Sequence, residues 1–332
     1  MQISELRDVV QTRSLEFVWD QWAQMGVLAM SRRQDEWAAD PEALLLLTLE
    51  VGRHDARLFE EVSDWMVRNE RLMSVRRLRN LCRDDTDEAL VDAFLTSVAR
   101  WRRRPRLVGD QTASRLDLSR GEPFFRDGSV PIRRRPDAGF LKHGWLKPEV
   151  EPSGKSQAPD LLAPINFAFR LRDILGVGAR AEVVRVLLTL ESPRLSTQAV
   201  TESAGFAKRN VQEALTSLHA AGVIQGSMLG NQHQYDIDRD KWAQLLGITR
   251  LPEYRDWPRL LHALRRLVRW LSHERLDELS EYMLASTART LADDIAPELS
   301  YAGVRSQAHS APGAAYWNTF EELTVAVLDA LG

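Results

Sequence analysis

A pattern over residues 179–237 restricts the fold of this 332-residue chain more than any other feature, because three short helix signals are followed at once by a hairpin signal. Apolar side chains recur at helical spacing over 179–190, which predicts the first helix. Ser196 is expected to cap a second helix over 197–203. Gly205 then follows at a tight turn, where a residue that tolerates positive φ is needed.

The third helix is expected to begin at Lys208 and to have one apolar and one polar side. Its apolar stripe, at positions i, i+3, i+4 and i+7, comprises Val211, Ala214, Leu215 and Leu218. The opposite side presents Arg209, Gln212, Glu213 and Thr216. A helix fits the major groove of DNA, where Arg can pair with guanine, Gln with adenine and Thr with a phosphate or a thymine methyl group. Lys208 can neutralise a phosphate, so these residues predict a recognition helix.

A two-stranded hairpin is predicted directly after this helix. Val223 begins the first strand, and the Gly230-Asn231 pair is typical of a hairpin turn. The second strand returns over 233–237 with alternate side chains inward. Helix, helix, turn, helix and hairpin is the order of elements in a winged helix-turn-helix. The wing tip, residues 228–233, has no Lys or Arg, so phosphate contacts must come from elsewhere.

The stretch from Lys208 to Ile224, KRNVQEALTSLHAAGVI, resembles bacterial winged helix-turn-helix regulators of the ArsR-like and MarR-like kind. Such families carry a recognition helix, a small-residue turn and a wing at these places. The resemblance covers about 70 residues and implies operator binding, usually as a symmetric dimer. The wider chain resembles a family of uncharacterised actinobacterial multidomain regulators encoded beside nucleotidyltransferase genes.

Charge and helix signals divide the chain into four parts. The net charge is −3, so any nucleic-acid surface must be local. Residues 101–150 hold 12 basic and 6 acidic residues, a local net charge of +6. The predicted parts are an N-terminal helical domain (1–101), a basic, Pro-rich connector (102–164), the winged helix-turn-helix domain (165–248) and a C-terminal helical domain (249–332).

Helix signals fill the N-terminal domain. Asp40 is a good N-cap before Pro41, and the nearly all-apolar run 43–51 predicts a helix that is buried on most sides. Further helices are expected over 57–66 and 87–101 from their apolar spacing.

Ser74 predicts the cap of another helix in this domain, with Arg76, Arg77 and Arg79 on its outer side. One interpretation makes it a second recognition helix, in a degenerate winged helix over residues 40–100. The other makes it an ordinary surface helix whose charge is balanced by Asp84, Asp85 and Asp87. We favour the ordinary helix because no hairpin signal follows.

The connector contains two arginine runs that end at prolines, and a connector of this length is often functional. The runs follow DNA phosphates, or they form a solvated linker, or their arginines pair with the acidic N-terminal domain. With them included, the predicted DNA-contacting residues are Ser196, Lys208, Arg209, Gln212, Glu213, Thr216, His233, Arg102, Arg103, Arg104, Arg133, Arg134 and Arg135.

The C-terminal domain is predicted to contain helices over 257–271, 276–291 and 316–331. The first has leucines on one side, and on the other side it has Arg259, Arg265, Arg266 and Arg269. This helix could serve a dimer or contact the DNA backbone. An ordinary domain helix with a solvated arginine face is the commonest case.

Catalytic, cofactor and membrane signals are weak in this sequence. The segment 153–156, Ser-Gly-Lys-Ser, echoes a phosphate-binding loop, but Glu149 stands where a glycine is needed and no apolar strand precedes it. The seven histidines show no metal spacing, and the single Cys82 fits a reducing cytoplasm. No apolar run approaches the ~20 residues that cross a bilayer, and the N-terminus has no signal-peptide pattern.

The sequence therefore predicts a mainly α protein, with a winged helix-turn-helix domain of three helices and a β-hairpin wing between helical domains. The expected function is sequence-specific binding of double-stranded DNA for transcription regulation in the cytoplasm, as a dimer, without enzyme activity, cofactor or metal. The alternative is a winged-helix scaffold or antitoxin-like protein that binds a protein partner.

Overall fold

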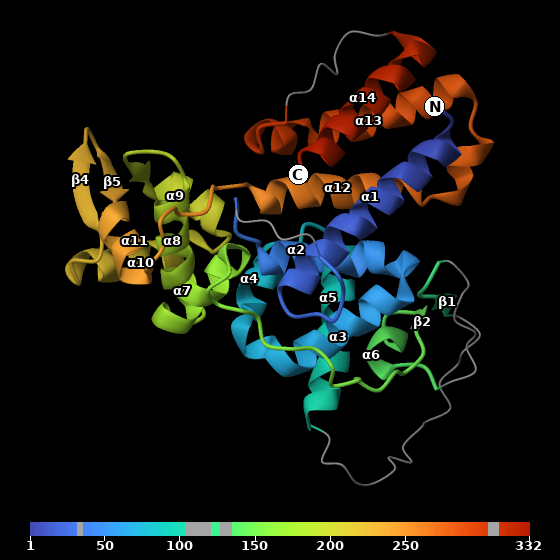
Figure 1. Ribbon diagram of the computed structural model, residues 1–332. Coiled ribbons are helices and arrows are strands. Elements are labelled where there is room, and N and C mark those ends of the chain that lie inside the picture. Colours follow the sequence, from blue (N-terminus) through green and yellow to red (C-terminus); the bar gives the residue numbers. More distant parts are fainter. Residues whose placement is uncertain (32–35, 104–120, 127–134, 305–311) are drawn as a thin grey trace.

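The computed structural model describes residues 1–31, 36–103, 121–126, 135–304 and 312–332, and these are mainly helical with a few short strands (Figure 1). Short 3₁₀ turns occur at Gly52–His54, Glu70–Leu72, Pro164–Asn166, Glu274–Glu278 and Gly313–Ala315. The mainly α fold class predicted from the sequence is confirmed.

The N-terminal part contains the α-helices α1 (Ile3–Gln24), α2 (Pro41–Val51), α3 (Ala56–Asn69), α4 (Val75–Asn80) and α5 (Asp85–Arg103). The two predicted caps are confirmed. The amide of Ala43 donates to the Asp40 carboxylate at 3.1 Å, and the amide of Arg77 donates to the Ser74 hydroxyl at 3.2 Å. Every residue of α2 is buried, as its apolar composition predicted.

The described part of the connector packs against these N-terminal helices. Strand β1 (Glu122–Pro123) pairs in parallel with β2 (Trp145–Leu146), and α6 (Ala138–Leu141) lies between them in sequence. Edge-to-face aromatic contacts hold the segment, with ring centroids 5.0 Å apart for Phe59 and Phe124. The described connector residues are therefore attached to the helices through buried aromatic side chains.

The central part has helices α7 (Phe167–Leu175), α8 (Ala179–Thr189), α9 (Thr197–Ala204), α10 (Lys208–Ala220) and α11 (Arg239–Leu246), and strands β3 (Leu195–Ser196), β4 (Gln225–Leu229) and β5 (Gln232–Asp236). The strands form one antiparallel sheet in the order β3-β5-β4. Leu229 pairs with Gln232 across the predicted Gly230-Asn231 turn, where Gly230 has a φ of +59°. The three predicted helices and the hairpin are present, but the first strand begins at Gln225 and not at the predicted Val223.

The C-terminal part contains α12 (Trp257–Leu271), α13 (Glu281–Tyr301) and α14 (Tyr316–Asp329). The predicted start of the second helix at residue 276 is wrong, because Leu276 lies in a 3₁₀ turn. The Ser280 side chain accepts from the amide of Met283 and caps α13 there.

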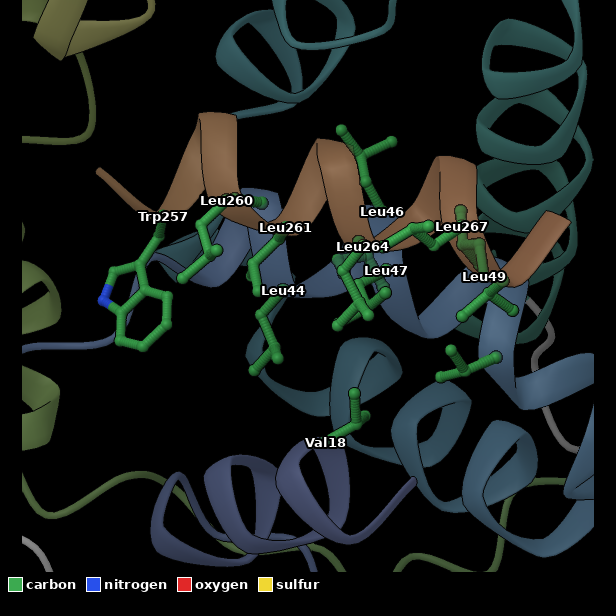
Figure 2. Packing of buried hydrophobic residues seen from close by; sticks show 14 of the residues in the cluster. Val18, Leu44, Leu46, Leu47, Leu49, Trp257, Leu260, Leu261, Leu264 and Leu267 are labelled. Atoms are coloured by element: carbon green, nitrogen blue, oxygen red, sulfur yellow. The ribbon is translucent and has the colours of Figure 1, made fainter. Parts of the chain in front are cut away.

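Two hydrophobic clusters fill the described residues. The larger one includes side chains from both chain ends, and Figure 2 shows leucines of α2 and α12 packed together, with Val18 of α1 beside them. The N-terminal and C-terminal helices, which were predicted to form separate domains, therefore share one apolar core. These helices together with their core are called the helical body below. The second cluster is built mainly from α7 to α11 and the strands.

Candidate nucleic-acid interface

Helix α10 has the two sides that its sequence predicts. Its buried residues are Val211, Ala214, Leu215 and Leu218. Its exposed residues include Lys208, Arg209, Gln212, Glu213 and Thr216. The apolar side packs on α8 and α9 in the second cluster, so one polar side remains on the surface. In Figure 1, α10 and the β4-β5 hairpin lie at the end of the molecule away from α13 and α14.

Arg209 and Glu213 form an ion pair along the exposed side of α10. The Arg209 Nε atom lies 2.9 Å from Glu213 Oε1, and the two side chains are 89% and 62% exposed. The hydrogen bond and charge of Glu213 raise the pKa of Arg209, so the guanidinium stays charged. Because the pair is open to water, it is weak and can be exchanged for a base or phosphate contact.

Ser196 and His233 have different surroundings. The Ser196 hydroxyl accepts from the amide of Ala199 at 3.2 Å and caps α9, so its main role in the structure is local. His233 is exposed on β5 and stacks on Tyr235, with ring centroids 6.3 Å apart. The wing tip beside it is apolar, since Met228 and Leu229 are 57% and 67% exposed.

The exposed charges of residues 165–248 are mixed in sign. The exposed cationic residues are Arg180, Arg194, Lys208, Arg209 and Lys241, and the exposed acidic residues are Asp173, Glu191, Glu202, Glu213 and Asp240. Arg194, which lies directly before β3, was not among the predicted DNA-contacting residues. A balanced surface provides few phosphate contacts, so DNA binding here would rest on a small local set.

The connector arginines are not gathered beside α10 where the structure describes them. Arg102 is paired with Glu70 of the helical body. Arg135 is exposed, and its carbonyl accepts from the amide of Glu149 at 2.8 Å. Figure 1 places α6, which follows Arg135, on the opposite side of the molecule from α10. The side chain of Arg103 and the whole of Arg104, Arg133 and Arg134 lie outside the described residues.

Helix α4, the other candidate recognition helix, has one arginine buried instead of exposed. Arg77 is completely buried, whereas Arg76 and Arg79 are exposed. Helix α4 is six residues long and is followed by α5. The expectation that Arg77 lies on the outer side is therefore wrong, because its guanidinium binds carboxylates inside the protein.

Arg77 belongs to a buried network of six charged groups, Asp40, Glu42, Arg77, Arg172, Glu182 and Arg185. The guanidinium of Arg77 lies 2.6 Å from Asp40 and 2.9 Å from Glu42. That of Arg172 lies 2.7 Å from both Glu42 and Glu182, which Arg185 also binds at 2.7 Å. Since the charges cancel and each is paired, the network can be buried, and it joins α2 and α4 to α7 and α8.

The network lowers the pKa of two of its carboxyl groups, Asp40 and Glu182. Burial by itself would raise the pKa of Asp40, but the charges of Arg77 and Arg185 hold it below its ordinary value. Burial opposes ionisation of Glu182 as well, and Arg185, Arg77 and Arg172 together lower its pKa. Both acids therefore stay ionised in the folded protein. The sequence signal was available, since Glu42 and Glu182 stand among apolar residues of helices.

The arginines of α12 are also paired with acids of neighbouring helices. Arg265 is buried and lies 2.7 Å from Asp87, and Arg269 binds Glu50 at 2.9 Å as well as Asp84 and Asp87. The expectation of a solvated arginine face is wrong for Arg265, because α2 and α5 supply carboxylates to this side of the helix.

The segment that echoes a phosphate-binding loop has its amides occupied by a carboxylate. Asp64 accepts from the amides of Gly154 at 2.6 Å and Ser156 at 2.9 Å. A phosphate would need these two amides as hydrogen-bond donors, but both already donate to the Asp64 carboxylate. The segment was also rejected as a phosphate-binding loop from its sequence.

Two clefts in the helical body contain titratable side chains. One of about 200 Å³ is lined in part by Glu60, Trp101 and Lys147. The other, of about 450 Å³, includes Cys82 and His143. Burial raises the pKa of the Cys82 thiol to about 11, so the sulfur stays protonated at neutral pH and is a poor nucleophile.

The chain matches no protein-family model, no curated protein and no solved structure. Within the described ranges, no group of three or more His, Cys, Asp and Glu side chains is arranged to hold a metal ion. In the same ranges, none of the helices has both the length and the apolar character needed to cross a bilayer. The candidate nucleic-acid interface is the exposed side of α10, which presents Lys208, Arg209, Gln212, Glu213 and Thr216.

Proposed function

We propose that residues 165–248 form a winged helix-turn-helix unit and that this unit binds double-stranded DNA with α10 in the major groove. The observation that carries the proposal is the uncovered polar side of α10. Arg209 and Gln212 stand on its first turns, where a recognition helix contacts base edges, and Lys208 and Thr216 flank them. The chain would then serve as a cytoplasmic transcription regulator, and a symmetric operator would require two copies.

The elements before and after α10 support this placement of the helix. Ser196, which caps α9, lies in β3, and β3 pairs with β5 of the hairpin that follows α10. The hairpin contributes no cation, because residues 222–236 contain neither Lys nor Arg. Sequence preference in this proposal comes from α10, and the wing contributes contact area without charge.

The direct test is selection from a randomised duplex library, followed by fluorescence anisotropy on the selected sequence. We expect Arg209→Ala to weaken binding about ten- to a hundredfold and to relax the preference at one base position, because a bidentate base contact is lost. The matched control is Arg250→Ala. Arg250 is also an exposed arginine paired with a glutamate three residues away, but it lies beyond α11, so this variant should bind like the wild type.

Two results would overturn the proposal in different ways. If Arg209→Ala binds the selected duplex like the wild type, α10 is not the recognition helix. If no duplex is enriched and anisotropy detects no binding at low salt, the unit does not bind DNA.

A second candidate function is the binding of a protein partner through the wing. The exposed Met228 and Leu229 at its tip favour this role, since apolar side chains at a protruding tip bury readily in a partner. Retained DNA binding by a Met228→Ser/Leu229→Ser variant would leave the wing available for that second role. Strongly reduced DNA binding would assign the tip to the DNA interface instead.

A further inference from the structure

The turn between α9 and α10 rests directly on α4 of the helical body. The Arg77 Nε atom donates to the carbonyl of Ala204, the last residue of α9, at 2.8 Å. The Asn80 side-chain amide donates to the carbonyl of Gly205 at 3.3 Å. Both carbonyls lie at the C-terminus of α9, where helix carbonyls have no partner within the helix. Helix α4 therefore supplies hydrogen bonds to the turn that leads into α10.

The Arg77 side chain is itself held in place by hydrogen bonds, so its guanidinium donates to the turn from a fixed position. Its two terminal nitrogens donate to Asp40 at 2.6 Å each, and one also donates to Glu42 at 2.9 Å. The side chain is completely buried and is fixed by these carboxylates. Charged, bidentate hydrogen bonds of this kind are short and direction-specific. The position of the Ala204 carbonyl is thus tied to the N-terminus of α2.

Gly205 allows the close approach between the turn and α4. It has a φ of +68°, and a Cβ atom on it would lie 3.1 Å from Leu81 Cδ2 and 3.3 Å from Arg77 Nε. The side chain of any larger residue would collide with Leu81 and Arg77, and the left-handed backbone would add a further cost.

A second contact attaches α9 to a different helix of the helical body, α12. The guanidinium of Arg259 on α12 lies 3.6 Å from the carboxylate of Glu202 on α9. Helix α9 and its turn are therefore attached to both α4 and α12. The exposed side of α10 takes no part in these contacts, and its ion pair between Arg209 and Glu213 lies within the helix.

We infer that Arg77 is a positioning residue for α10: it fixes the turn before that helix, so the helical body sets the direction in which α10 is presented. This inference rests on the proposed function for its consequence in DNA binding, but the contact itself does not. DNA affinity should then depend on a buried residue that never touches DNA.

The test compares Arg77→Lys with Arg185→Lys. Both variants keep the charge of the buried network, and both exchange a planar fork for a single ammonium group. A lysine at 77 cannot reach the acids and also donate to the Ala204 carbonyl. Arg185 binds Glu182 and lies 3.9 Å from Asp40, and its side chain donates to neither α9 nor α10, so its variant is the matched control.

Hydrogen exchange followed by mass spectrometry reads the turn without reference to DNA. We expect amides at the end of α9 and the start of α10 to exchange at least about tenfold faster in Arg77→Lys, which corresponds to the loss of one charged hydrogen bond. The same amides should be unchanged in Arg185→Lys, although both variants lower the melting temperature. On a selected duplex, the affinity of Arg77→Lys should fall about tenfold and that of Arg185→Lys should not.

Equal exchange at the turn in the two variants would overturn the inference and leave Arg77 a merely structural residue. Faster exchange at the turn of Arg77→Lys, together with no DNA binding by the wild type, would support the positioning contact and refute the proposed function. If Arg77→Lys does not fold, Asn80→Ala takes its place, because Asn80 is exposed. It should speed exchange at the same amides, and no change in it would overturn the inference.

Discussion

Helices α4 and α10 look alike in sequence and are used differently in the structure. Each has cationic residues in its first turn, two arginines in α4 and Lys208 with Arg209 in α10, and each has apolar residues on another side. The Arg77 side chain of α4 is completely buried and makes four hydrogen bonds, whereas the Arg209 side chain of α10 is 89% exposed and is paired with Glu213 alone. One arginine stabilises the joint between two parts of the chain, and the other is available to a ligand.

The difference lies in the acids that surround each helix. Asp40 and Glu42 of α2 meet α4 in three dimensions, and a buried guanidinium is tolerated only because such carboxylates pair with it. Helix α10 faces solvent on its polar side, so among the described residues Arg209 pairs with Glu213 of the same helix. An arginine on a helix is therefore a candidate for ligand contact only when it is exposed and not buried in a network of carboxylates.

The largest expected effect is on stability at α4. Replacing Arg77 with Met should lower the free energy of unfolding by about 3–5 kcal/mol, because Asp40 and Glu42 would be left buried without their partner. Arg76→Ala, an exposed neighbour on the same helix, should change it by no more than about 0.5 kcal/mol. Urea denaturation measures both. Equal effects would mean that the two arginines of α4 do not differ as their burial indicates.

The acids of the network should give a smaller, pH-dependent effect. The pKa values of Asp40 and Glu182 are lowered on folding, so their contribution to stability is complete above their ordinary values of 3.8 and 4.5. It should be lost as the pH falls below those values towards the folded-state values. Thermal unfolding between pH 6 and pH 2 should show Glu182→Gln with a flatter pH dependence than the wild type. Glu213→Gln, the exposed counterpart on α10, should keep the wild-type slope; identical slopes in all three proteins would contradict this account.

The turn between α9 and α10 offers a comparison of two glycines. Gly205 and Gly247 both end helices with φ near +65°, at +68° and +61°. Gly205→Ala should cost about 2 kcal/mol, because its Cβ meets Leu81 and Arg77, and Gly247→Ala about 1 kcal/mol, because no atom lies within 4 Å of its Cβ. Chemical denaturation of the two variants separates backbone strain from contact with α4. A smaller cost at Gly205 would show that the turn does not rest on α4.

The smallest effect concerns the salt dependence of DNA binding. Because Lys208 is the α10 cation assigned to a phosphate and the wing has no cation, we expect a slope of log K against log [salt] of about −1, at roughly 0.9 for each phosphate neutralised. Anisotropy titrations across salt concentrations give this slope. A slope steeper than about −5 would mean that arginines far from α10 also contact the DNA.

Local features of the fold follow from the sequence where short-range chemistry decides them. The caps at Asp40, Ser74 and Ser196, the Gly230-Asn231 turn and the buried stripe of α10 depend on residues within a few positions of each other, and all were predicted. The exposure of Lys208, Arg209, Gln212, Glu213 and Thr216 was predicted for the same reason, whereas their contact with DNA stays a prediction.

Long-range pairing could not be predicted from one sequence. Arg77 meets Asp40 and the Ala204 carbonyl across 37 and 127 positions, and Arg265 meets Asp87 across 178. Helical spacing placed Arg77 and Arg265 on outer, solvated sides, which is wrong, because it could not show that neighbouring helices supply acids there. The shared core of α2 and α12 was missed for the same reason.

Arginine modification by phenylglyoxal, with and without the selected duplex, tests the central claim most directly, because it reads α10 and α4 in one sample. We expect bound DNA to protect Arg209 from modification while Arg76 and Arg79 of α4, which are also exposed, react at unchanged rates. Unchanged reactivity of Arg209 in the bound complex, or protection of Arg76 and Arg79 in its place, would contradict the assignment of α10 as the recognition helix.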